Sequence, residues 1–435
     1  MSPSASVCGW YPAMNGRWGT MRTPCARTRR ATPTDRLPRP GGRAPMVSSA
    51  HEPELRSMRD TEFPIHVLPE VIDDLHRRVR ATRWPDQLTD TTWEHGADLR
   101  YIRDLAQSWV DAFDWARVEG ALNAEMPSRR CTIDGLDVHF TRTVPDLASR
   151  ERGLPLVLLH GWPSSFVEMR ALVPRLVRAG HEVIVPSLPG HGFSSIPLRV
   201  GFGADEGAAV IASLMTDVLG HERYVAHGGD RGSFVATSLG LTAPANVAGI
   251  HLTLPGGIPG EGGDRSAEET EWLTTTAAWA VEEGGYSAIQ GTRPQSLAYA
   301  MHDSPVGMLA WIVEKHRAWS DCGGDVERCI SREQLLTNAT IYWVTGTFRA
   351  ASHWYWEHRV RPPAAMRPIR IEVPTAVVRY PKEVMRTPRS AVGRKYQLVR
   401  WTERPSGGHF PAYEDPEFLA DDLATFASDL GATLR

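Results

Sequence analysis

Arg223-Tyr224-Val225-Ala226-His227-Gly228-Gly229-Asp230-Arg231-Gly232-Ser233-Phe234 is the stretch that decides the fold of this chain. A short apolar run with β character leads into two glycines, an acid, one further residue, a glycine and a helix-compatible segment. This order predicts a nucleophile elbow, a tight strand-to-helix turn that lifts one side chain above a sheet. Small residues flank such a position because the backbones of the strand and the helix pass close together.

Asp230 occupies the position at which most such turns carry a serine. A carboxylate has a reference pKa of about 3.9, so it is ionised at neutral pH and needs no base to activate it. Its attack on an alkyl carbon would leave an ester on the protein, which water must then hydrolyse. Taken alone, Asp230 fits a turn aspartate in a glycine-rich loop equally well. The choice between the two therefore depends on the rest of the chain.

The composition is that of an ordinary globular protein. The chain has 435 residues, of which 42% are hydrophobic and 23% charged, and a net charge of −3 that does not point to nucleic acid or an anionic membrane. No apolar run approaches the roughly 20 residues of a membrane helix. An odd, scattered set of cysteines without metal-ligand spacing favours a reducing, cytoplasmic location. The cysteines are Cys8, Cys25, Cys131, Cys322 and Cys329.

Residues 1–57 differ from the rest of the chain. Eight arginines face one acid, Asp35, before residue 46, and Pro, Gly, Ser and Thr fill the gaps without apolar periodicity. Such a composition cannot bury enough surface to fold alone, so we expect a disordered basic tail or an over-extended start. A nucleic-acid-binding arm and a transit peptide are less favoured alternatives. A cleavable signal is disfavoured because no apolar core follows Arg29-Arg30.

An N-terminal helical region is predicted over residues 58–142. Apolar residues recur at helical spacing from Val67 to Val79, and Pro85 ends this pattern. A second amphipathic stretch runs from Leu99 to Trp115, and its aromatic residues are most simply core. The segment 131–140 predicts a hairpin that turns at Asp134-Gly135.

A mostly parallel, doubly wound sheet is predicted from apolar strands that alternate with helical stretches. The expected strands cover residues 156–159, 182–186, 223–228, 247–254, 375–380 and 396–401. The α/β core would then comprise residues 143–254 and 371–435. The tryptophan-rich insertion 255–370 between them predicts a helical lid.

Two residues after the elbow complete a catalytic order. Glu383 follows a predicted strand directly, and His409 lies in a glycine-containing loop before the final helix near Pro416. Nucleophile, acid and histidine in this order are typical of the α/β-hydrolase fold. In the same fold the oxyanion hole is formed by the N–H groups of Trp162 and Arg231. Alone, Glu383 would be read as a surface acid and His409 as a loop histidine.

The motifs together resemble the microsomal-type epoxide hydrolases over residues 60–432. They are His160-Gly161-Trp162-Pro163, Gly228-Gly229-Asp230, Pro381-Lys382-Glu383, Gly407-Gly408-His409-Phe410, Arg83-Trp84-Pro85-Asp86 and Asp303-Ser304-Pro305-Val306-Gly307. The resemblance implies hydrolysis of an epoxide to a vicinal diol with water, without a cofactor or metal. It also implies that the lid tyrosines Tyr286 and Tyr355 hold the epoxide oxygen, although tyrosines in an apolar lid are more often packing residues.

One residue departs from the family pattern, which usually has an aromatic residue, most often tryptophan, after the nucleophile. Here that position is Arg231. Its guanidinium could stabilise the charge of Asp230 and weaken the nucleophile, recognise a polar or anionic substrate group, or point away.

Three other functions are alternatives to epoxide hydrolysis. A dehalogenase shares the aspartate nucleophile but needs halide donors, commonly a tryptophan where this chain has Arg231, and has no use for Tyr286 and Tyr355. A serine esterase is disfavoured because the elbow lacks serine. A non-catalytic ligand-binding protein of this fold is disfavoured by the complete set of Asp230, Glu383 and His409. The many lid aromatics indicate a mostly apolar substrate body, and a homo-oligomer remains possible.

Overall fold

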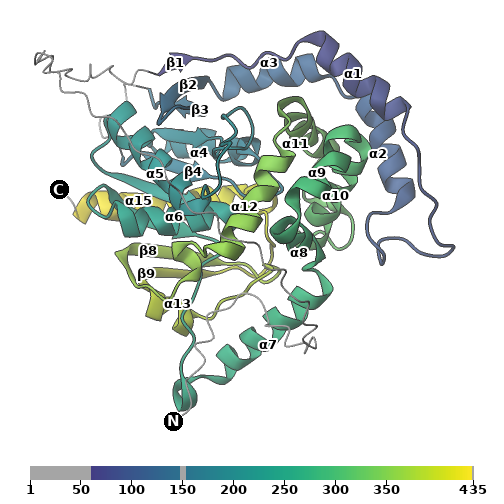
Figure 1. Ribbon diagram of the computed structural model, residues 1–435. Coiled ribbons are helices and arrows are strands. Elements are labelled where there is room, and N and C mark those ends of the chain that lie inside the picture. The colour runs from purple at the N-terminus through teal and green to yellow at the C-terminus, as the bar shows by residue number, and fades with distance from the viewer. Residues whose placement is uncertain (1–59, 147–152, 434–435) are drawn as a thin grey trace, which may run out of the picture.

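One nine-stranded sheet forms the centre of the molecule within residues 60–146 and 153–433, which are the residues that the computed structural model describes (Figure 1). The predicted tail, residues 1–57, lies outside them. The strand order is β1-β2-β3-β5-β4-β6-β7-β8-β9. The strands are β1 Thr61–Glu62, β2 Ser128–Ile133, β3 Leu136–Thr143, β4 Leu156–Leu159, β5 Val183–Pro186, β6 Tyr224–Gly228, β7 Val247–Leu252, β8 Ile371–Arg379 and β9 Tyr396–Glu403.

Neighbouring strands are parallel from β5 to β9 and antiparallel from β1 to β5, which confirms the predicted mostly parallel, doubly wound sheet. The β2–β3 hairpin turns where the sequence predicts it. Ile133 pairs with Leu136, and the two turn residues, Asp134 and Gly135, both have positive φ (49° and 76°). A type I′ turn requires this geometry, and its twist matches that of the flanking strands.

Helices cover both faces of the sheet, as a continuous apolar strand requires. Along β4, Val157 and Leu159 pack in the core that contains α5 and α6, whereas Leu156 and Leu158 pack with α4 and α15 on the opposite face. The helices are α1 Pro69–Arg80, α2 Leu99–Asp111, α3 Trp115–Glu125, α4 Val173–Arg178, α5 Ala204–Ser213, α6 Asp230–Thr242, α7 Ala267–Glu282, α8 Gly285–Thr292, α9 Pro294–Asp303, α10 Pro305–Trp319, α11 Arg332–Thr345, α12 Phe348–Val360, α13 Arg389–Lys395, α14 Pro411–Glu414 and α15 Pro416–Thr433.

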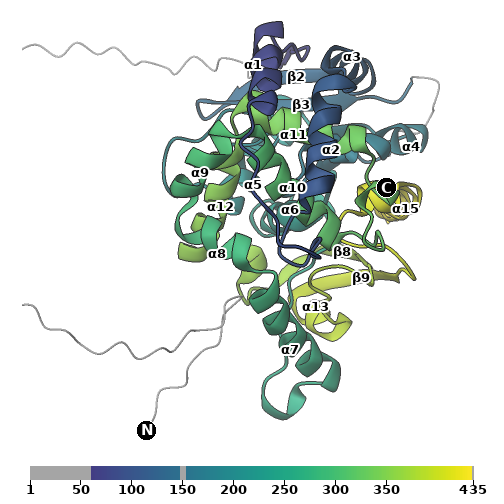
Figure 2. The same ribbon diagram turned by 90° about the vertical axis from the view of Figure 1, so that its right-hand side faces the viewer.

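The N-terminal helices pack against the insertion 255–370, which the sequence predicts to be a lid. Figures 1 and 2 show α1 and α2 running beside the lid helices, and their buried apolar residues share one cluster with α10 and α11. The indole N–H of Trp109 donates to the Thr340 hydroxyl at 2.9 Å. The amphipathic stretch from Leu99 to Trp115 is broken into two helices, because Asp114 caps the start of α3 with its side chain.

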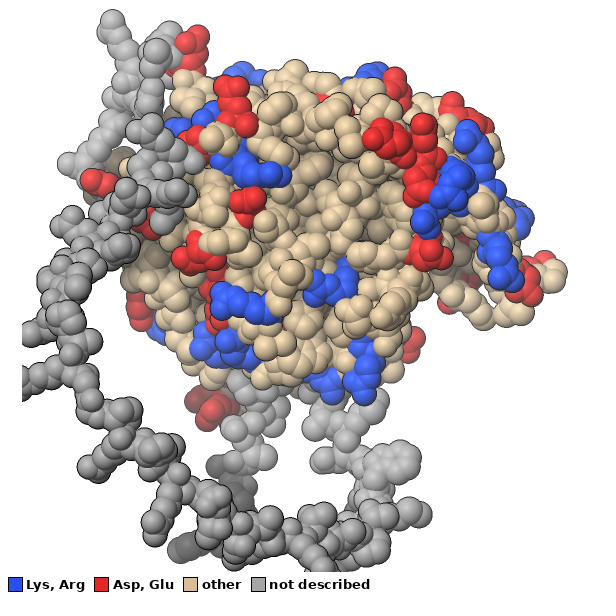
Figure 3. Space-filling view, turned by 45° about the horizontal axis from the view of Figure 1, so that its top comes forward, with Lys and Arg blue, Asp and Glu red and all other residues tan. Residues whose placement is uncertain are grey.

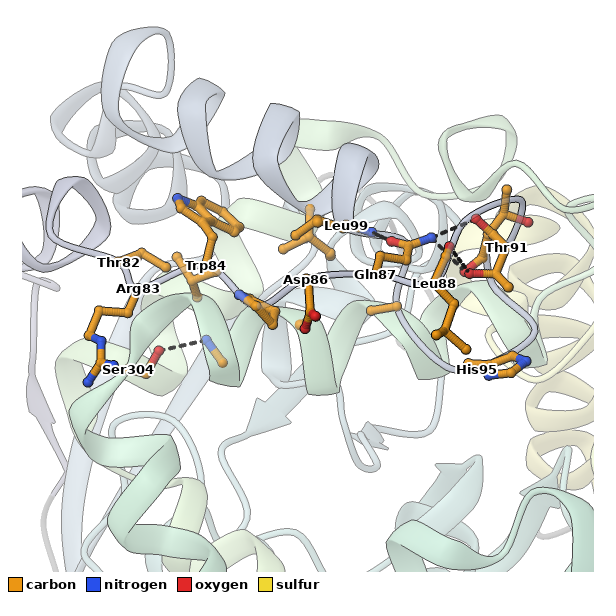
Figure 4. A pocket seen from close by; sticks show the side chains of 17 residues that line it. Thr82, Arg83, Trp84, Asp86, Gln87, Leu88, Thr91, His95, Leu99 and Ser304 are labelled. Carbon is orange, nitrogen blue, oxygen red and sulfur yellow. Dashed lines mark hydrogen bonds between the residues drawn. The ribbon is translucent and has the colours of Figure 1, made fainter.

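A pocket of about 380 Å³ lies between the segment 82–99 and α10 (Figure 4). Gln87 holds this segment, since its amide nitrogen donates to the Thr91 carbonyl at 2.7 Å and its oxygen accepts from the Leu99 N–H at 2.6 Å. None of the residues predicted to be catalytic lines this pocket. On the face in Figure 3, acidic and basic side chains are interspersed.

At the elbow, the backbone of α6 packs closely against β4 and β6, next to the predicted nucleophile. A Cβ added at Gly232 would lie 1.9 Å from the Leu159 carbonyl oxygen, and one added at Gly228 would lie 2.2 Å from the Gly232 carbonyl carbon. Real Cβ atoms do not approach backbone this closely, so α6 reaches β4 and β6 only because these residues lack side chains. The flanking glycines predicted from the sequence are therefore steric requirements.

Gly232→Ala is expected to lower the free energy of unfolding by about 3 kcal/mol or to prevent folding, because backbone must move to admit the methyl group. Urea denaturation followed by circular dichroism measures the loss. Gly120→Ala is the matched control, since Gly120 lies in α3 with nothing within 4 Å of an added Cβ. This change should raise the stability slightly. Equal effects of the two substitutions would contradict the steric account.

Candidate active site

Asp230 is the first residue of α6, directly after Gly229 at the end of β6. Its φ is +43°, a left-handed conformation that costs an L-residue free energy and is typical of functional positions. A fifth of its side-chain surface (20%) stays accessible beneath the lid, whereas His409 beside it is 1% exposed. The elbow thus presents this carboxylate to a space that a ligand could enter.

His409 lies between two carboxylates. Its Nε2 is 3.5 Å from Asp230 Oδ2, and its Nδ1 is 2.5 Å from Glu383 Oε1. The same Glu383 oxygen accepts the Val384 N–H at 2.7 Å, which fixes the carboxylate. The structure therefore brings together the three residues that the sequence placed in catalytic order, although they lie 153 and 26 positions apart along the chain.

The two carboxylates control the charge of the imidazole. Burial alone would lower the pKa of His409, but Glu383 and Asp230 outweigh it and raise that pKa well above its usual range. Burial would likewise raise the pKa of Asp230, but His409, Arg231 and the Trp162 N–H lower it. Asp230 is thus a carboxylate in the resting protein, beside a protonated His409.

The loop of His409 is bonded to the end of α10. The His409 N–H donates to the Trp319 carbonyl at 2.9 Å, and the Gly407 N–H donates to Asp321 Oδ2 at 3.0 Å. Gly407 has φ +108°, which explains a glycine at this position. The Trp319 ring also meets the His409 imidazole edge to face, with 5.1 Å between ring centroids.

The predicted oxyanion donors lie beside the nucleophile. The Trp162 N–H donates to Asp230 Oδ1 at 2.8 Å. The Arg231 N–H belongs to the first turn of α6, whose N–H groups have no acceptor within the helix. Gly161 is required here, because a Cβ at this position would lie 2.4 Å from the Asp230 Cβ.

The lid brings both predicted tyrosines to this site. Tyr286 is the second residue of α8, and Tyr355 lies in α12. Their rings meet edge to face at 5.5 Å, and Trp162 stacks on Tyr286 at 5.2 Å with an interplanar angle of 6°. Burial raises the pKa of each phenol, so both hydroxyls keep their protons and can donate hydrogen bonds.

Arg231 does not point away from the site. Its side chain is buried (2% exposed), and its guanidinium carbon lies 3.7 Å from the centroid of the Tyr355 ring. Its Nη1 is 3.3 Å from Nδ1 of His358, one turn further along α12. Of the three alternatives open from the sequence, a harmless orientation is therefore excluded.

Two buried residues next to the site were missed by sequence reasoning. Glu168 follows the His160 motif by eight positions, and burial raises its pKa to about 7. This acid could have been noticed because it stands directly after the apolar pair Phe166-Val167. Trp319 contacts both His409 and Tyr286. No signal distinguished it among the many lid tryptophans.

Within the described ranges, no cluster of three or more His, Cys, Asp or Glu side chains has the arrangement of a metal site. In the same residues, no helix combines the length and the apolar character needed to cross a membrane.

Two family models match the chain: "Epoxide hydrolase N terminus" over residues 60–169 and "alpha/beta hydrolase fold" over residues 155–282. The chain is 37% identical over 375 residues to a Stigmatella aurantiaca (strain DW4/3-1) protein named "Putative epoxide hydrolase", with 83% of each chain covered. It is 32% identical to epoxide hydrolase 1 of Sus scrofa, with 84% of this chain and 87% of the relative covered. The chain belongs to the epoxide hydrolase family.

Solved structures of this family share the fold. The juvenile hormone epoxide hydrolase of the silkworm Bombyx mori superimposes with a TM-score of 0.80 at 26% identity, covering 87% of this chain and 96% of that one. The epoxide hydrolase of Aspergillus niger gives a TM-score of 0.76 at 30% identity, covering 86% and 97%. The resemblance stated from the motifs and the predicted α/β-hydrolase fold are both confirmed.

Asp230→Asn is expected to lower the pKa of His409, because it removes one of the two carboxylates that favour the imidazolium. Proton NMR titration of the imidazole measures this change, and adding Glu383→Gln should lower the pKa further. His139 is an internal control: burial already lowers its pKa to about 3, and its ring nitrogens bond the hydroxyls of Ser187 and Ser128. An unchanged His409 titration in Asp230→Asn would contradict the geometry.

Proposed function

We propose that this epoxide hydrolase opens an epoxide by attack of Asp230 and forms a vicinal diol through a covalent aspartyl ester. The observation that carries the proposal is the geometry around Asp230. His409 lies beside it and contacts Glu383, while the rings of Tyr286 and Tyr355 pack against Trp162, whose N–H binds Asp230. No cofactor or metal is required for these steps.

In the first step, an Asp230 oxygen attacks an epoxide carbon while Tyr286 and Tyr355 hydrogen-bond the ring oxygen and supply its proton. The C–O bond of the ring breaks as the ester bond forms. His409 takes no part in this step, since the carboxylate is already ionised. The protonated phenols are suited to this role because a strained ether oxygen gains negative charge as it leaves.

In the second step, His409 removes a proton from water, which attacks the carbonyl carbon of the Asp230 ester. Esterification itself prepares the base, because it removes the Asp230 charge that helps to hold the His409 proton, and that proton passes to the tyrosine that gave up its own in the first step. The Trp162 N–H already bonds the Asp230 oxygen, and we propose that it and the Arg231 N–H hold the oxyanion that forms there. Glu383 orients the ring and stabilises the imidazolium.

The dehalogenase alternative gains no support from the site. The position after the nucleophile carries a guanidinium stacked on Tyr355 rather than an indole donor. We propose a small-molecule epoxide with a mostly apolar body as substrate, since Trp162, Tyr286 and Trp319 form aromatic walls at the site. A cytoplasmic location and a homo-oligomer stay predictions from the sequence.

Removing the tyrosine hydroxyls tests the first step. Tyr286→Phe and Tyr355→Phe should each slow ester formation roughly 10²-fold, and the double substitution should nearly abolish it. Single-turnover kinetics with styrene oxide, with enzyme in excess, measures this rate. Tyr299 is a matched control because this tyrosine is 75% exposed, and Tyr299→Phe should leave the rate unchanged. A wild-type rate in the double mutant would remove both tyrosines from the mechanism.

Removing the base tests the two-step mechanism. His409→Gln should consume about one equivalent of epoxide and stall, because release of the ester needs the base and its formation does not. The adduct on Asp230 would appear by intact mass spectrometry, and Glu383→Gln should slow the same step less. In the wild type, a single turnover in ¹⁸O-water should place label in the Asp230 carboxylate. Label in the diol alone, without an adduct in His409→Gln, would make Asp230 a general base.

A further inference from the structure

The two lid tyrosines have different electrostatic surroundings. Tyr355 has the Arg231 guanidinium on its ring face at 3.7 Å. Tyr286 also has a cation near its ring, but Lys315 Nζ lies 5.2 Å from the centroid and is bonded to Glu314 at 2.7 Å, with Glu283 at 3.7 Å. The charge of Lys315 beside Tyr286 is therefore neutralised by neighbouring acids, and the charge of Arg231 lies closer to the Tyr355 ring than Lys315 does to the ring of Tyr286.

Arg231 lacks a comparable counterion. Among the described residues, no carboxylate oxygen lies within 4.0 Å of its guanidinium. His358, its hydrogen-bond partner, cannot neutralise it, because burial and Arg231 itself lower the pKa of His358 well below its usual range. Asp230, the preceding residue, carries the opposite charge, and Arg231 helps to lower its pKa.

The position of Arg231 is costly in three ways. A buried cation without a paired carboxylate loses its hydration without full compensation. A cation in the first turn of a helix also opposes the helix dipole, and Arg231 is the second residue of α6. The side chain also leaves Nε buried without a hydrogen-bond partner. Stacking on Tyr355 offsets part of this cost, and a position that breaks these rules is a candidate for function.

Direct recognition of an anionic substrate does not fit this geometry. The side chain is 2% exposed, and it is covered by Tyr355 and His358 of the lid helix α12. A carboxylate of a ligand would have to displace one of these rings to reach Nε. The guanidinium therefore acts on the substrate indirectly, through Tyr355, on whose ring it lies.

We propose that Arg231 is a positioning residue that fixes the Tyr355 ring over the nucleophile and makes Tyr355, rather than Tyr286, the proton donor to the epoxide oxygen. This inference rests on the proposed function. The Tyr355 O–H bond breaks as the epoxide C–O bond breaks, so the proton ends on the alcohol and the electron pair on the phenolate. The guanidinium then faces an anion. Once the ester has removed the Asp230 charge, the proton of His409 passes by way of water to the phenolate, and the proton that His409 then takes from the attacking water restores the imidazolium.

The phenol pKa values agree with this assignment. Burial raises the pKa of Tyr355, and the charge of Arg231 is the main influence that opposes the rise. Burial raises the pKa of Tyr286 as well, and there Tyr355 and Asp230 add to the rise while Arg231 is the weakest of the named influences.

A pair of double-mutant cycles tests the proposal. Arg231→Gln should slow ester formation from styrene oxide about 10- to 100-fold in the wild type and in Tyr286→Phe, but less than about 2-fold in Tyr355→Phe, whose hydroxyl is already absent. The rate is measured in single turnovers, with the ester followed by intact mass. Arg231→Lys, which keeps the charge but cannot lie flat on the ring, should recover part of the rate. Lys315→Gln, the matched control at the other tyrosine, should change it less than about 3-fold.

Each other result has a distinct meaning. An equal effect of Arg231→Gln in both tyrosine backgrounds would overturn the proposal, because Arg231 would then act on Asp230 or on folding. A change confined to the KM of para-carboxystyrene oxide, with its methyl ester unaffected, would also overturn it in favour of substrate recognition. Absence of diol from the wild type with every epoxide would refute the proposed function itself. Thermal unfolding checks each variant, and the Arg231→Lys cycle replaces the Arg231→Gln cycle if the latter does not fold.

Discussion

The close approach of helix α6 to strands β4 and β6 is the constraint on which the rest of the active site depends. Backbone atoms pass where a Cβ of Gly228 or Gly232 would have to lie, and this contact forces Asp230 into a left-handed conformation at the tip of the turn. Both faces of the sheet are packed with helices, so the turn cannot relax without disturbing two cores. The packed sheet thus holds the strained Asp230 in one fixed position at the end of β6.

Around this carboxylate the charges alternate in sign. Asp230 and Glu383 flank a protonated His409, and Arg231 follows Asp230 in the chain, so the four formal charges cancel in the resting protein. A neutral substrate can enter such a site without adding a charge imbalance. In the proposed cycle, protons move among these groups while the total stays constant, which limits the electrostatic reorganisation that each step needs.

Local sequence predicted the sheet and the catalytic order because these depend on short-range patterns. Apolar runs bounded by turn residues marked the strands, and glycines marked the loops around Asp230 and His409. The short edge strand β1 was missed, since Thr61–Glu62 is two exposed residues whose pairing with β2 is set by tertiary contacts. The direction of the Arg231 side chain could not be predicted from the local sequence either. It depends on Tyr355, more than a hundred positions away, and on how α12 packs against α6.

The hydrogen bonds between the His409 loop and the end of α10 couple the position of the catalytic base to the position of this helix. The His409 N–H is held by the Trp319 carbonyl, and the Trp319 ring also touches Tyr286. A displacement of α10 large enough to admit a bulky ligand would therefore move the His409 imidazole and weaken the packing of Tyr286 at the same time. Because of this coupling, neither step of the reaction can proceed while α10 is displaced: the first step would lack Tyr286 and the second would lack His409 in its working position.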